Sequence, residues 1–177
     1  MPSIVGILQH TPWWVFALLA LLAALGIRSL RTRTTAVWRL LIVPAIFIGW
    51  GILSIAEKAA VSPALSVDWL AAGVIGVAIG WAVTRLDGVQ VDRAAGRVGM
   101  PGSAVPLLRN LAIFLAKYCL AVAMAIAPAR QPALAHWDVA VSGIGAGYFV
   151  GWLIRFARKY RAAPPHELAA PVGSVSP

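Results

Sequence analysis

Five long runs of apolar residues constrain this chain more than any other feature of its sequence. They cover about residues 12–30, 37–56, 67–86, 105–127 and 137–156. A helix needs roughly 20 apolar residues to cross about 30 Å of hydrocarbon, so each run is a candidate transmembrane helix, and the first is the shortest. Of the 177 residues, 60% are hydrophobic and 12% are charged, a balance outside the range of soluble domains. The runs therefore predict an all-α integral membrane protein, with a five-helix transmembrane bundle over residues 1–161.

The positively charged residues predict the orientation of this bundle. Of the 15 Lys and Arg residues, twelve lie beside the connections that follow the first, third and fifth runs. Only Lys58 and Arg130 lie on the other side, and Lys117 lies inside the fourth run. Lys and Arg concentrate on the cytoplasmic side of membrane proteins. We therefore expect a multi-pass membrane protein with its N-terminus outside and its C-terminus in the cytoplasm.

The net charge of +9 also bears on partners. In a soluble protein such an excess would point to nucleic acid, but here the cations lie next to apolar runs. Anionic lipids of the cytoplasmic leaflet are the partner that this placement favours, and no nucleic acid is expected. Residues 1–9, before the first run, hold no Lys or Arg, whereas a signal peptide begins with a positive segment. The first run is therefore expected to be a helix that stays in the membrane.

The one sizeable connection, residues 87–103, is predicted to be cytoplasmic. Val89 and Val91 alternate with polar residues before Asp92, and Gly96 can adopt a positive φ, a pattern typical of a short β-hairpin. Ser103 can cap the helix that follows. The hairpin is either a docking surface or an ordered connector. Residues 162–177, rich in Pro, Ala, Gly and Ser, predict a disordered cytoplasmic tail.

Small residues recur at intervals of four in the third and fifth runs, and so share one face of each helix. Such faces let helix backbones approach closely in a membrane. Their partner can be another helix of this chain, a second copy in a homo-oligomer, or another membrane protein. The residues predicted to pack helices in this way are Ala72, Gly76, Gly80, Gly143, Gly147 and Gly151.

Lys117 is the residue that departs most from the apolar pattern. It lies near the middle of the fourth run, where a charge costs about 3 kcal/mol or more and usually faces a protein interior or water. Asn110 lies seven residues earlier, two turns away on the same helix face. Lys117 and Asn110 therefore form a candidate intramembrane polar site. The alternative is a structural lysine that reaches the interface, loses its proton, or pairs with backbone carbonyls or Ser54.

No pattern in the sequence points to catalysis or to a cofactor. The predicted outer face holds two histidines and three carboxylates, but they lack the spacing of a metal site; these are His10, Glu57, Asp68, His136 and Asp138. Neither an HExxH motif nor a Gly-rich phosphate loop is present, and the single cysteine, Cys119, excludes an intrachain disulfide. We expect a protein that is not an enzyme and that has no cofactor and no metal.

Two segments, HTPWWVFALLALLAALGIRSLRTR at residues 10–33 and VDRAAGRVGMPGS at residues 91–103, resemble a family of small, uncharacterised multi-pass proteins of the bacterial inner membrane. The chain is also distantly similar to membrane proteins related to CcdC. The resemblance implies a multi-helix fold in the bacterial inner membrane, so that the outer N-terminus is expected in the periplasm, and it carries over no catalytic residue. The sequence thus predicts a structural or partner-binding membrane subunit. The alternative is a small transporter or channel with its polar site at Lys117 and Asn110.

Overall fold

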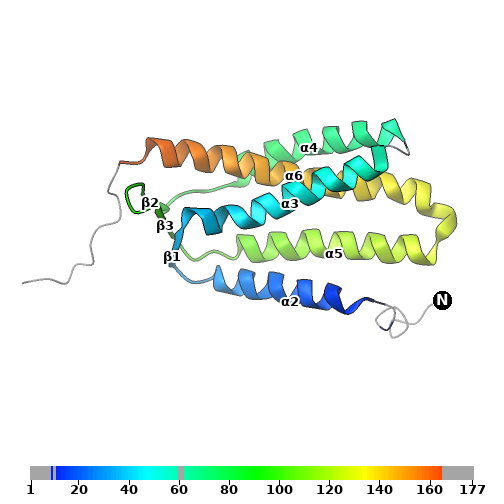
Figure 1. Cartoon of the computed structure of the whole chain (residues 1–177), viewed down its shortest axis with the longest axis horizontal. Coiled ribbons are helices and arrows are strands. Elements are labelled where there is room, and N and C mark those ends of the chain that lie inside the picture. Colours follow the sequence, from blue (N-terminus) through cyan, green and yellow to red (C-terminus); the bar gives the residue numbers. More distant parts are fainter. Residues whose placement is uncertain (1–8, 10, 60–61, 165–177) are drawn as a thin grey trace, which may run out of the picture.

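A computed structural model describes residue 9 and residues 11–59 and 62–164. In these residues five α-helices run along the long axis of the molecule, each antiparallel to the one before it (Figure 1). A 3-10 turn, η1 (Pro128–Arg130), leads into the last helix. The helices are α2 (Trp13–Arg28), α3 (Val37–Ala59), α4 (Pro63–Val83), α5 (Val105–Ile126) and α6 (Gln131–Ala162).

Four stretches of the described residues are long and apolar enough to cross a membrane: Val37–Ala56, Pro63–Val83, Val105–Ile126 and Pro128–Ala162. α2 is apolar but has 16 residues, which is about 24 Å of helix, somewhat less than the hydrocarbon thickness. The helical bundle expected from the sequence is thus present, with four helices of spanning length and one shorter helix.

Several helices extend beyond the apolar runs that predict them. α4 begins at Pro63 rather than at residue 67, because Ser62 is extended and proline suits the first helical turn. α6 begins at Gln131 and ends at Ala162, six residues beyond the predicted run at each end. An apolar run marks the part of a helix that suits hydrocarbon, whereas the helix itself continues through polar residues. The predicted disordered tail, residues 162–177, lies outside the described residues from residue 165 onward.

α4 and α6 form the closest helix pair of the molecule, and they run parallel to each other (Figure 1). A Cβ atom added at Gly147 would lie less than 3.0 Å from the carbonyl oxygen of Gly73, and one at Gly76 would lie as close to the carbonyl oxygen of Ile144. Both small-residue faces make such contacts, because Gly80, Gly143 and Gly151 also abut backbone atoms of the facing helix. The two backbones touch along several turns, so glycine is required at these positions for a steric reason.

A small antiparallel sheet closes one end of the bundle. Its strands are β1 (Arg33–Ala36), β2 (Gln90–Asp92) and β3 (Arg97–Met100), in the order β1-β3-β2. β2 and β3 form the predicted hairpin: Gly96 has φ +61°, and the Ala95 N–H donates to Asp92 Oδ1 at 2.8 Å. β1 was not predicted. It is short and polar, and it is a strand because it pairs with β3.

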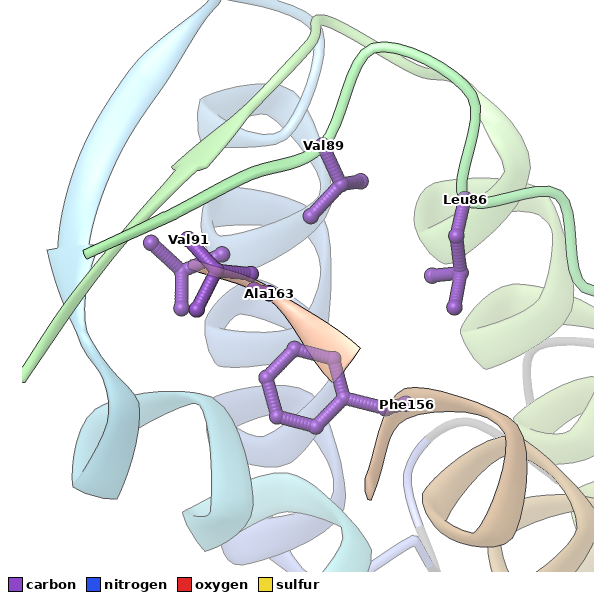
Figure 2. Packing of buried hydrophobic residues seen from close by; sticks show 6 residues of the cluster. Leu86, Val89, Val91, Phe156 and Ala163 are labelled. Atoms are coloured by element: carbon purple, nitrogen blue, oxygen red, sulfur yellow. The ribbon is translucent and has the colours of Figure 1, made fainter. Parts of the chain in front are cut away.

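One face of this sheet packs on the ends of the helices. Val91 and Val98 lie opposite each other in β2 and β3 and are fully buried. They join Leu86, Val89, Phe156 and Ala163 in one hydrophobic cluster (Figure 2). The sheet, together with the helix ends packed against it, is called the basic end below, because most Lys and Arg residues lie there.

The α4–α6 contact makes a direct prediction about stability. Gly147→Ala places a Cβ against the carbonyl of Gly73, so we expect the free energy of unfolding to fall by about 1–3 kcal/mol. Gly49→Ala is the matched control, since a Cβ there meets no atom within 4 Å. Alanine favours the helix, so this control should be as stable as wild type or more stable by up to about 1 kcal/mol. Thermal unfolding in detergent, followed by tryptophan fluorescence, measures both. Equal melting temperatures for the two variants would contradict the close contact.

Candidate functional site

Lys117 of α5 forms an ion pair with Asp138 of α6. The Lys117 ammonium donates to Asp138 Oδ1 and lies 3.4 Å from the backbone carbonyl oxygen of Asp138. The Asp138 side chain is buried, with 8% of its surface exposed, whereas 33% of the Lys117 side chain is exposed. A buried carboxylate needs such a partner, because desolvation without one is costly.

The antiparallel connection from α5 to α6 brings these two residues together. Lys117 lies nine residues before the end of α5, and Asp138 lies seven residues after the start of α6. At 1.5 Å per residue, both lie about 10–14 Å from the connection. Because α6 begins at Gln131, Asp138 falls two turns inside the helix rather than at its outer end, where the sequence placed it.

Asn110, the other residue of the predicted polar site, has a different environment. It is buried, and its Oδ1 accepts from Nε and Nη2 of Arg109 at 3.1 and 3.0 Å. The Arg109 guanidinium also lies over the ring of Phe149, 4.4 Å from the centroid, in a cation–π contact. The structure therefore divides the predicted stripe into two local arrangements, one at Lys117 and one at Asn110.

Lys117 and Asp138 line a cavity of about 370 Å³ between α2, α3, α5 and α6. Most other lining residues are aliphatic or aromatic, Tyr118 and Trp50 among them, and Ser142 adds a hydroxyl. Asn110 does not line it. This volume lies at the lower end of the range for ligand cavities, which combine apolar walls with a few polar groups. Sequence patterns contain no signal for this cavity, because it depends on how far α2 lies from α3.

The end of the bundle away from the sheet carries a second pair of polar side chains. Nδ1 of His136 in α6 lies against Oδ2 of Asp68 in α4, and both side chains are about half exposed. His10 and the side chain of Glu57 lie outside the described part of the chain. Within that part, no three His, Cys, Asp or Glu residues are grouped as metal ligands. His136 and Asp68 thus contact each other, whereas Asp138 contacts Lys117.

At the basic end, cations of α6 bind carbonyl groups at the end of α4 and in the segment that follows it. Arg155 donates to the carbonyl oxygen of Trp81, and Lys159 donates to that of Leu86 at 2.7 Å. The hydroxyl of Thr84 donates to the carbonyl oxygen of Gly80. The last carbonyls of a helix lack intrahelical partners and carry partial negative charge, so Arg155 and Thr84 complete the end of α4, whereas Lys159 holds the segment that follows it.

Comparison with known proteins places the chain in a family but gives no activity. The chain belongs to DUF6622, a family of unknown function whose model matches residues 2–165. This match confirms the expected family of uncharacterised proteins. No curated protein and no solved structure matches the chain. The likeness to proteins related to CcdC stays a prediction.

The ion pair predicts an asymmetry between single and double substitutions. Lys117→Met alone leaves Asp138 buried without its cation, and we expect the protein to lose about 3 kcal/mol of stability. In Lys117→Met/Asp138→Asn neither charge remains, so most of this loss should be recovered. Thermal unfolding of wild type, both single variants and the double variant measures the coupling between the two sites. Additive effects of the two substitutions would show that the pair contributes nothing.

Proposed function

We propose that the protein is a multi-pass subunit of the bacterial inner membrane that binds a partner or supports a membrane complex without catalysing a reaction. The observation that carries this proposal is the combination of an apolar bundle surface with one strongly basic end. Large hydrophobic side chains of all five helices are exposed to the surroundings. In α4, for example, Val67, Leu70, Val74 and Ile75 are exposed. A hydrocarbon environment removes the cost of exposing such side chains to water.

The orientation follows from the basic end. Eight of its arginines are exposed, and they surround the sheet and the nearby helix ends: Arg28, Arg31, Arg39, Arg85, Arg93, Arg97, Arg158 and Arg161. The positive-inside tendency supports a cytoplasmic location for this end. α2 begins at the opposite end (Figure 1) and is proposed as a fifth, short span. Local thinning of the bilayer accommodates a short span at modest cost. This topology places the N-terminus in the periplasm and the C-terminus in the cytoplasm.

A structural or partner-binding role is supported by how the charged side chains are used. Lys117 and Asp138 pair with each other, His136 pairs with Asp68, and Arg155 binds a helix end. The transporter alternative placed Lys117 and Asn110 at a single site. Because the two residues have different partners, no observation favours that alternative.

Labelling of single cysteines tests the proposed topology. In a Cys119→Ala background, Ala129→Cys in η1 and Ala95→Cys in the hairpin place one exposed thiol at each end of the bundle. We expect a membrane-impermeant maleimide to label intact spheroplasts at residue 129 only, and to label residue 95 only after the membrane is opened. Labelling of residue 95 in sealed spheroplasts would reverse the orientation.

Exposed arginines at the basic end also predict a preference for anionic lipid. A cation near an anionic surface contributes about 1 kcal/mol, so Arg93→Gln/Arg97→Gln should reduce the enrichment of phosphatidylglycerol around the protein severalfold. Arg130→Gln, an exposed residue at the other end, is the control and should change little. Fluorescence quenching by spin-labelled phosphatidylglycerol in mixed-lipid nanodiscs measures the enrichment. An effect of equal size in the control would contradict a localised lipid contact.

A further inference from the structure

The cavity beside Lys117 is bounded by a helix that is fixed at both ends. At the basic end, the Ser103 N–H donates to the carbonyl oxygen of Ser29 at 2.8 Å, and the Ser29 hydroxyl lies 3.0 Å from the carbonyl oxygen of Ser103. Near its start, α2 is linked to α5 through Thr11 Oγ1 and the Tyr118 hydroxyl, 2.9 Å apart. Between these two links, α2 packs mainly on α5. The cavity occupies the space that separates α2 from α3. The two links that hold α2 on α5 therefore also maintain this space.

The walls of the cavity suit a hydrocarbon chain. α2 contributes Val15, Leu18, Leu22 and further apolar side chains, and α3 contributes Val43, Ile46 and Phe47. A volume of about 370 Å³ matches one acyl chain or a small ring system better than a two-chain phospholipid. An apolar cavity excludes water unless several polar groups line it together, so a molecule from the lipid phase is the natural occupant.

Lys117 determines the polar part of that occupant. An ammonium group has three N–H donors, and among the described residues both acceptors of Lys117 are oxygens of Asp138. One of these contacts, at 3.4 Å, is long. A donor left unsatisfied in a low-dielectric site is costly, so an oxygen acceptor of a ligand would be stabilised there. Asp138 already balances the charge of Lys117, and a ligand without net charge is therefore favoured over an anion.

We propose that this cavity binds a neutral, single-chain amphiphile whose carbonyl or hydroxyl oxygen accepts a hydrogen bond from Lys117. The hydrocarbon chain lies between α2 and α3, and the polar head lies at the ion pair. This proposal rests on the proposed placement of the bundle in a membrane, since the ligand enters from the lipid phase. It assigns to the Lys117–Asp138 pair the recognition of a lipid head group.

Photo-crosslinking of the full chain in phosphatidylcholine nanodiscs tests the proposal. The probe is a monoacylglycerol with a diazirine in its chain, the competitor is mono-oleoyl glycerol, and a diazirine alkane without oxygen reports general contact with lipid. Ala121→Phe fills the cavity from α5, and Ala125→Phe is its matched control, one turn away, exposed, and outside the cavity. Mass spectrometry locates the labelled peptides.

We expect the monoacylglycerol to label cavity-lining peptides of α2 and α5 and the competitor to suppress this labelling. Ala121→Phe should reduce the labelling about tenfold, and Ala125→Phe should leave it unchanged. Lys117→Met/Asp138→Leu removes the donor without leaving a lone charge or adding a new donor, and should weaken competition about tenfold, the loss of one hydrogen bond to a charged group.

Two results would overturn the proposal. Even labelling of all lipid-facing helices, insensitive to competitor and to Ala121→Phe, would show that no site exists. Unchanged competition in the double variant would show that the ion pair does not bind the head group. In both cases alkane labelling of the helices would leave the membrane placement standing, whereas absence of alkane labelling would count against the membrane placement itself.

Discussion

Direct contact between the backbones of α4 and α6 determines the arrangement of the other helices. Because Gly147 and Gly76 carry no side chain, these helices approach until the backbone of each touches the other. Dispersion contacts over several turns replace the hydrophobic drive that a lipid environment would not supply between helices. α3 packs against both members of this pair, and α5 packs against α6. α2, which packs mainly on α5, lies farthest from the central pair, and the cavity forms on its inner side.

The same close approach explains how the ends of the helices are completed. Since α6 lies directly against α4, Arg155 can reach the carbonyl group of Trp81 in the last turn of α4, and Lys159 can reach that of Leu86 just beyond the helix. Of the cations that would mark the cytoplasmic side, Arg155 therefore also stabilises a helix end, and Lys159 the segment after it. The exposed arginines of the basic end are the ones for which a contact with anionic lipid is proposed, although Arg39, Arg93 and Arg158 also lie over aromatic rings of the chain. The basic end thus holds cations that bind backbone carbonyls and others whose proposed role is electrostatic.

The sequence predicts the elements of this molecule better than their contacts. Apolar runs are sufficient to place the helices, and Asp92 with Gly96 is sufficient to place the hairpin turn, because both signals are local. β1 depends on a partner strand more than 60 residues later, and nothing in Arg-Thr-Thr-Ala anticipates it. Lys117 stands out in the sequence because a charge in the middle of an apolar run is costly. Its partner Asp138 does not stand out, because the fifth apolar run begins at residue 137, six residues after α6 begins, so the run places Asp138 at a helix end. The cavity depends on distances between helices, which no periodicity encodes.

The order of strands in the small sheet has a consequence for how the chain is made. β1 leaves the ribosome before α3, but β3, which pairs with it, follows only after α4. During this interval β1 has an unpaired edge, and contacts between residues far apart in sequence are slow to form. The helical hairpin α3–α4 would therefore have to be inserted before the sheet can close. Assembly of the sheet would then be a late step that joins the α2–α3 connection to the α4–α5 connection. A fragment that stops after α4 should therefore retain its helices but lack the sheet at their ends.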